Sequence, residues 1–129
     1  MTLLFDTSVI IGGYSSEGVD TGDAPAVSAV TVGELAYGLD TASAADRELR
    51  SRRLRVVLVS FEVIPFGVEE AKLYGVLSAM VQRSGRDPRP RRMDLQIAAT
   101  AAAARCPVLT ANPRDFEGLA PLVDVIPIA

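Results

Sequence analysis

The 129-residue sequence contains no histidine, and it has a single cysteine and a single lysine. Without histidine the chain lacks the commonest metal ligand and the side chain that most often acts as a general base near neutral pH. One cysteine, Cys106, excludes an internal disulfide and a thiolate zinc site, and we expect it to be a small buried residue. Acid–base chemistry therefore falls to carboxylates, to a tyrosine or to metal-bound water.

The sequence also lacks a strong net charge and any long apolar run. Its formal net charge is −3, so no global positive field attracts nucleic acid. No window reaches the ~18 apolar residues of a membrane span, and no basic segment precedes the N-terminal apolar run, which predicts no signal peptide. With 49% apolar residues, the chain is expected to form one domain over residues 1–129 of a soluble cytoplasmic protein.

Short apolar segments alternate with helical patterns along the chain. Strands are predicted over 3–5, 26–30, 62–66, 107–110 and 124–128, and helices over 7–11, 31–39, 44–60, 68–82 and 95–105. Leu3-Leu4-Phe5 does not alternate, so this strand is expected to be buried on both faces and central. Pro127 lacks an N–H and places the last strand at an edge. The pattern predicts an α/β fold with a mostly parallel sheet of four to five strands flanked by helices, with loops at 12–25 and 85–92.

Acidic residues recur at the carboxyl ends of the predicted strands. Asp6 ends the first strand, Glu34 follows the second by about one helical turn, and Asp94 begins the alanine-rich helix. Asn112 and Asp115 follow the fourth strand. The carboxyl ends of parallel strands share one rim, where ligands bind in open α/β sheets. Clustered carboxylates need a cation, and oxygen ligands without histidine or cysteine favour Mg²⁺ or Mn²⁺.

Each of these residues also has a purely structural explanation. Asp6 and Asp94 are acceptable helix N-caps, and Thr31-x-x-Glu34 has the form of a capping box. The segment 112–115 has the form of an Asx turn with an exposed Asp115. These explanations are independent of one another, whereas a metal site accounts for all four acids together.

Four motifs in order along the chain resemble those of the PIN-domain ribonucleases, and more narrowly those of the VapC toxins of bacterial VapBC toxin–antitoxin pairs. The motifs are Asp6-Thr7-Ser8, Thr31-Val32-x-Glu34-Leu35, Asp94-Leu95-x-Ile97-Ala98-Ala99 and Leu109-Thr110-x-Asn112-x-x-Asp115-Phe116. The resemblance covers essentially the whole chain, and the ordered set is more specific than any single motif. It implies a PIN-like three-layer fold.

The resemblance also implies an activity, a cofactor and partners. The implied protein is a Mg²⁺- or Mn²⁺-dependent endoribonuclease that cuts structured RNA such as transfer or ribosomal RNA. It is expected to form a homodimer that is silenced by a cognate antitoxin. By motif match, the catalytic and metal-binding acids are Asp6, Glu34, Asp94 and Asp115, and the supporting residues are Thr7, Thr110 and Asn112. Some relatives have Asp where this chain has Asn112, so the identity of the fourth ligand stays open, as does the choice between one metal ion and two.

The expected mechanism is hydrolysis in which water activated by the ion attacks phosphorus in line and leaves a 5′-phosphate and a 3′-hydroxyl. Because the cleft is acidic, RNA affinity must come from basic segments outside it. One candidate is the helix carrying Arg47 to Arg55. The others are the loop arginines Arg83, Arg86, Arg89, Arg91 and Arg92, whose alternative role is that of a solvated loop.

Three other functions share parts of this pattern. A phosphoryl-accepting signalling domain needs a lysine on a late loop, but the one lysine, Lys72, lies in a predicted helix. A phosphatase of the Asp-x-Asp type needs a second aspartate at position 8, where this chain has Ser8. The third is a catalytically inactive PIN-like module that binds RNA or an antitoxin. Metal-dependent cleavage distinguishes it from the enzyme.

Overall fold

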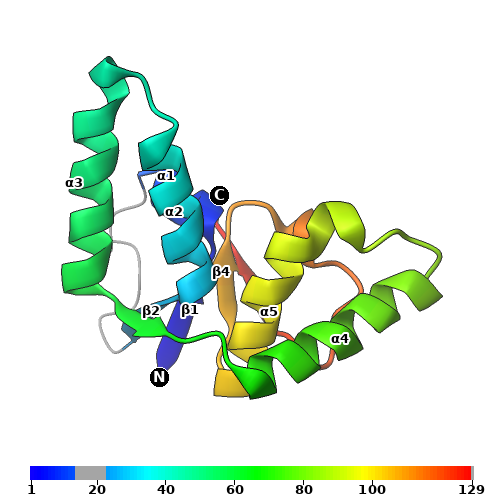
Figure 1. The fold of residues 1–129 in the computed structure, drawn as a ribbon. Coiled ribbons are helices and arrows are strands. Elements are labelled where there is room, and N and C mark those ends of the chain that lie inside the picture. The colour runs from blue at the N-terminus through cyan, green and yellow to red at the C-terminus, as the bar shows by residue number, and fades with distance from the viewer. Residues whose placement is uncertain (14–22, 129) are drawn as a thin grey trace.

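The central layer is a sheet of five parallel strands in the order β3-β2-β1-β4-β5 (Figure 1). The computed structural model describes residues 1–13 and 23–128, so most of the loop expected at 12–25 lies outside the described residues. The strands are β1 (Thr2–Phe5), β2 (Ala24–Ser28), β3 (Glu62–Ile64), β4 (Val108–Thr110) and β5 (Val125–Pro127). The central position of β1 and the edge position of β5 are both confirmed.

Helices cover both faces of the sheet. They are α1 (Thr7–Ile11), α2 (Ala29–Asp40), α3 (Ala44–Ser60), α4 (Val68–Arg83) and α5 (Arg92–Ala104), with short 3₁₀ helices η2 (Arg89–Arg91) and η3 (Pro113–Phe116). Figure 1 shows α2 and α3 on one side of the strands and α4 and α5 on the other. This is the expected three-layer arrangement. Within the described residues, no helix is long and apolar enough to cross a membrane.

Successive apolar side chains of β1 point to opposite faces of the sheet, so the strand contributes to both halves of the core. Leu3 and Phe5 pack with Val57 of α3 on one face of the sheet, while Leu4 packs with Leu77 of α4 on the other. All three β1 side chains are at most 4% exposed. Burial of such a side chain contributes roughly 1.5–3 kcal/mol, so the strand that ends at Asp6 is anchored from both sides.

The alanine-rich helix α5 is central, as predicted. Ala98, Ala99 and Ala101 are fully buried in the core that α4 and the sheet share with α5. Small side chains allow α5 to approach its neighbours closely. The first turn of α5, which carries Asp94, is thereby held at the carboxyl rim of the sheet.

Two helix starts differ from the sequence prediction. Helix α2 begins at Ala29 rather than Thr31, because the Ser28 hydroxyl accepts the Val30 N–H at 3.1 Å and acts as the N-cap. Helix α5 begins at Arg92, inside the segment predicted as a loop. In α2 the apolar residues Ala29 and Val30 already belong to the helix, and in α5 Arg92 and Met93 do.

Candidate active site

Four acidic side chains lie at the carboxyl rim of the sheet, as the sequence predicted. Asp6 follows β1 directly, Glu34 lies in the second turn of α2, Asp94 in the first turn of α5, and Asp115 in η3 after β4. Burial raises the pKa of Asp94 most, and the charges of Asp115, Asp6 and Glu34 all act on it and raise it further. The four carboxylates therefore share one electrostatic environment.

Asp6 is a buried carboxylate held by two hydroxyl groups. It is 3% exposed, and its Oδ2 accepts hydrogen bonds from Ser8 Oγ at 2.7 Å and Thr110 Oγ1 at 2.9 Å. The side chain makes no capping hydrogen bond to α1, so the N-cap explanation of this carboxylate is wrong. A buried charge is costly unless it is hydrogen-bonded or paired, and these two bonds offset part of that cost.

Backbone groups orient the two hydroxyls in turn. The Ala111 N–H donates to Ser8 Oγ at 3.2 Å, and the Asn112 N–H donates to Thr110 Oγ1 at 2.9 Å. Each hydroxyl has one proton and donates it to Asp6. The Ser8 and Thr110 hydroxyl oxygens, 3.5 Å apart, therefore have no proton left to form a hydrogen bond with each other. Within the described part of the chain, Oδ1 of Asp6 accepts no hydrogen bond, so it is the oxygen left for a ligand.

Glu34 is held by a chain of threonines. Thr7 Oγ1 donates to Glu34 Oε1 at 2.9 Å, and Thr31 Oγ1 lies 2.9 Å from Thr7 Oγ1. Because the Thr7 proton is directed at Glu34, Thr31 must donate to Thr7. The capping-box explanation is wrong, since Ser28 is the N-cap and Thr31 is buried inside α2.

Glu34 and Asp94 have raised pKa values for related reasons. Burial and then the charge of Asp6 raise the pKa of Glu34, and the Thr7 hydrogen bond lowers it in part. Burial and then the three other carboxylates raise the pKa of Asp94 to about 7, and nearby Arg91 opposes this. No side-chain capping bond forms at the start of α5, so Asp94 is not an N-cap. A carboxyl in this state favours a cation beside it.

The segment after β4 forms the 3₁₀ helix η3 rather than an Asx turn. Asn112 makes no side-chain capping bond, and its role here is the N–H that binds Thr110. Arg91 fixes this segment from η2, because Nε donates to the Asp115 carbonyl at 3.0 Å and Nη2 also donates to it. Arg91 therefore positions the backbone of one acid and lowers the pKa of another, Asp94.

The donor set suits a hard divalent cation. Among residues 1–13 and 23–128, no group of three or more Asp, Glu, His or Cys side chains is placed to hold a metal ion. Mg²⁺ keeps several of its waters and takes only one or two carboxylates directly, so a preformed group of three is not required. The carboxylate oxygens and the absence of histidine both fit Mg²⁺ or Mn²⁺.

The other four loop arginines differ in their contacts. Arg86 pairs with Glu117 at 3.2 Å and Arg89 with Asp87 at 2.9 Å, while Arg83 Nε donates to the Ala79 carbonyl at 3.2 Å. The guanidinium of exposed Arg92 has no hydrogen-bond or ion-pair partner within the described residues. All four lie where they can meet solvent or an RNA phosphate.

Sequence reasoning missed three contributors to the site. Ser8 lies two residues after Asp6 and within the same motif, so this signal was available. Thr31 was visible within its motif, but its contact with Thr7 bridges 24 residues. The structural role of Arg91 had no local signal, because its partners lie 24 and 26 residues away.

Comparisons with known proteins agree with this geometry. Residues 3–120 match the PIN domain family. Ribonuclease VapC5 of Mycobacterium tuberculosis is 34% identical over 90% of this chain and 86% of its own. Ribonuclease VapC of Rickettsia bellii is 30% identical over 99% and 97%. The crystal structure of VapBC-5 from M. tuberculosis, a member of the VapBC family of toxin–antitoxin systems, aligns with a TM-score of 0.82 at 31% identity, covering 98% of both chains.

The raised pKa of Asp94 predicts a stability that depends on pH. The unfolded chain releases this proton near the ordinary value of 3.8, while the folded chain keeps it up to about 7. The free energy of unfolding of the metal-free protein should therefore fall as pH rises from about 4 to about 7. Asp94→Asn should remove roughly 1–2 kcal/mol of that fall. This is less than the free energy equivalent to the whole pKa shift, because solvent screens a half-exposed carboxylate.

Urea unfolding in EDTA across this pH range measures the effect. Asp40→Asn is the matched control, since Asp40 is 75% exposed. If the wild-type and Asp94→Asn curves stay parallel across the range, the carboxylate cluster does not act on Asp94.

Proposed function

Because the chain belongs to the PIN-domain family and, within it, to the VapC group, we propose that it is a Mg²⁺- or Mn²⁺-dependent endoribonuclease toxin neutralised by a cognate antitoxin. The observation that carries this proposal is the cluster of four carboxylates, in which Asp6, Glu34 and Asp115 all act on Asp94. Such a set is unfavourable in the free protein and becomes useful when a cation is bound. The proposed substrate is structured RNA such as transfer or ribosomal RNA.

In this proposal Asp6 and Asp94 hold the ion directly, and Glu34 and Asp115 complete its shell through water. When bound, the ion supplies Lewis acidity and neutralises charge at the phosphate. Ser8 and Thr110 keep Asp6 in one orientation through its Oδ2. This fixed geometry reduces the reorganisation needed when substrate binds.

Glu34 is the proposed proton acceptor for the attacking water. The chain has no histidine, and a carboxyl with a raised pKa is a better base than an ordinary one. Thr7 holds one of its oxygens, Oε1, at 2.9 Å, so the other is available for the water proton. The new bond joins the water oxygen to phosphorus, the bond from phosphorus to the 3′-oxygen breaks, and this oxygen takes a proton from solvent water, which yields a 5′-phosphate and a 3′-hydroxyl.

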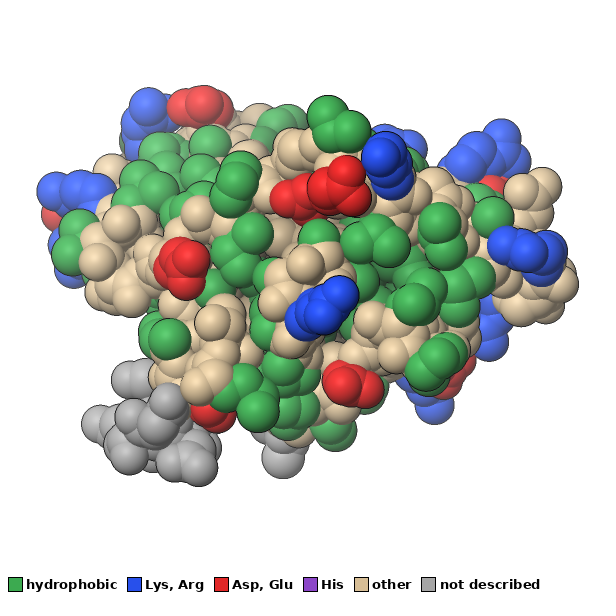
Figure 2. Space-filling model, turned by 90° about the horizontal axis from the view of Figure 1, so that it is seen from below, with side chains coloured by type: hydrophobic (Ala, Val, Ile, Leu, Met, Phe, Trp, Pro, Cys, Tyr) green, Lys and Arg blue, Asp and Glu red, His purple; other side chains and the backbone are tan. Residues whose placement is uncertain are grey.

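Basic segments outside the cleft are assigned to the RNA phosphates. Seen from below in Figure 2, the basic side chains gather mostly toward the two lateral ends of the molecule. We assign phosphate contacts to Arg92 and to Arg89, whose ion pair with Asp87 is exposed and weak. Arg91 is excluded because its guanidinium is partly buried and engaged with the Asp115 carbonyl. Each phosphate contact adds roughly 0.7–0.9 to the log–log salt dependence of binding.

Asp6→Asn tests the enzyme directly. Asn keeps the shape but removes a charge from the ion site, so RNA cleavage in Mg²⁺ or Mn²⁺ should fall roughly 100-fold or more, beyond the 10–100-fold typical of outer-shell changes. Metal-free stability should hold or rise because carboxylate repulsion is reduced. The measurement is cleavage of transfer and ribosomal RNA with mapping of the new ends, alongside thermal melts with and without metal.

Asp40→Asn is again the control and should cleave like the wild type. Equal cleavage by Asp6→Asn, or its unfolding, would contradict the assignment of Asp6 as the centre of the site. A wild type that binds RNA or antitoxin but cleaves nothing in either metal would favour the inactive module instead.

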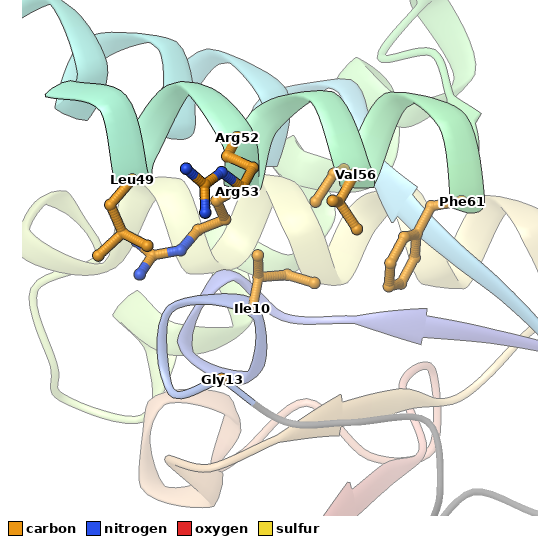
Figure 3. A pocket seen from close by; sticks show the side chains of 8 residues that line it. Ile10, Gly13, Leu49, Arg52, Arg53, Val56 and Phe61 are labelled. Carbon is orange, nitrogen blue, oxygen red and sulfur yellow. The ribbon is translucent and has the colours of Figure 1, made fainter.

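The antitoxin is assigned to an apolar groove between α1 and α3 with a volume of about 430 Å³. Figure 3 shows side chains of α3 facing Ile10 of α1. The lining residues are Ile10, Gly13, Leu49, Arg52, Arg53, Val56, Val57 and Phe61. Leu49 and Val56 are more than half exposed. Arg53 has no ion-pair partner among the described residues, so the groove suits an apolar segment with an acidic residue beside it.

Val56→Asp tests this groove. A buried unpaired charge in the contact should weaken antitoxin binding about tenfold or more, while cleavage of RNA stays unchanged. Titration calorimetry with the cognate antitoxin gives the affinity. Val59→Asp is the matched control, because Val59 lies on the same helix, is 87% exposed and does not line the groove. Equal losses in both variants, or none in either, would show that the antitoxin binds elsewhere.

A further inference from the structure

A second hollow, with a volume of about 300 Å³, adjoins the carboxylate site. The residues that line it are Thr7, Ile11, Gly33, Glu34, Tyr37 and Met93. Thr7 and Glu34 belong to the hydrogen-bonded carboxylate site as well. The hollow is therefore continuous with the proposed catalytic cleft.

Its apolar walls come from the same elements as the acids. Tyr37 lies three residues after Glu34 on α2, so both side chains share one face of that helix. Ile11 lies four residues after Thr7 on α1, and Met93 directly precedes Asp94 on α5. Each apolar wall residue is therefore carried by the same helix as a residue of the carboxylate site.

These walls are exposed although they are apolar. Tyr37 is 73% exposed, Ile11 56% and Met93 37%, and the Tyr37 hydroxyl has no hydrogen-bond partner among the described residues. The floor is open at Gly33, where an added Cβ would meet no atom within 4 Å. An exposed aromatic ring beside a phosphate-cleaving site is the arrangement on which a nucleobase stacks.

We propose that this hollow is a nucleobase subsite, in which the Tyr37 ring stacks on the base next to the cleaved phosphate while Ile11 and Met93 pack against its edges. The inference rests on the proposed ribonuclease function and narrows its substrate class. A base that enters the hollow is unstacked and unpaired, so cleavage falls in a single-stranded loop of structured RNA. Stacking tolerates any base, because every base has a flat face.

The probe is an RNA hairpin carrying 2-aminopurine at one loop position at a time, in Mg²⁺. Stacking on an aromatic ring quenches this fluorophore, so wild type and Tyr37→Phe should quench at least one loop position. Tyr37→Ala should lose the quench and bind the hairpin about tenfold more weakly, which is typical of the loss of one base–aromatic stack. Hairpins with 2-aminopurine in the stem should show no such quench.

Gly33→Leu separates the subsite from folding. The new side chain projects into open space and leucine is a better helix former than glycine, so the thermal midpoint should hold or rise while the quench is lost. Val68→Ala is the control, since Val68 has nearly the same exposure as Tyr37, at 72%, and lies on α4. It should behave as wild type.

Cleavage mapped in the same samples separates this inference from the proposed function. Quenching that depends on Tyr37 without any cleavage would support the subsite and overturn the nuclease. Cleavage without such quenching, or a wild type that does not bind the hairpin, would overturn the subsite. If Tyr37→Ala alters only antitoxin binding or oligomeric state, the hollow serves a protein partner and the proposal is wrong.

Discussion

The fixed carboxylate of Asp6, at the end of the central strand, is the constraint on which the rest of the site depends. Its Oδ2 is held by the hydroxyls of Ser8 and Thr110, and these are oriented by backbone N–H groups just after β4. Two neighbouring strands must therefore end at the same level for the network to form. The Leu4–Val108 and Phe5–Leu109 register provides that alignment.

The remaining acids are held around this point by elements that pack on opposite faces of the sheet. Glu34 is tied to α1 through Thr7, and Asp94 is positioned by the buried alanines of α5. Burial and then the neighbouring carboxylates raise the pKa of Asp94, which shows that ionising all four acids together is unfavourable. The two apolar cores offset that cost, so the scaffold tolerates a local cluster that is stable only with a cation or a retained proton.

Much of this arrangement is predictable from local patterns in the sequence. The non-alternating Leu3-Leu4-Phe5 run places β1 in the centre, Pro127 places β5 at the edge, and α3 begins and ends where its pattern predicts. The start of α2 was predicted two residues late, because Ala29 and Val30 are apolar and continue the β2 pattern. The cap that decides this boundary, Ser28, is a single side-chain contact.

The site is less predictable than the fold because its hydrogen bonds join distant segments. The strand ends locate the four acids, but the Thr110 bond to Asp6 bridges 104 residues and has no local pattern. The functional assignments rest on motif order, and the homodimer expected from the resemblance stays a prediction. Local rules therefore place the residues on the rim, while tertiary contacts decide how each side chain is held.

A crystal structure of the protein with Mn²⁺, phased on the anomalous signal of the ion, tests the central claim most directly. The carboxylate cluster predicts an anomalous peak at the rim of the sheet, with oxygens of both Asp6 and Asp94 roughly 2 Å from the ion. Saturating Mn²⁺ that leaves no peak between these two carboxylates, or that occupies only sites elsewhere on the surface, would contradict it.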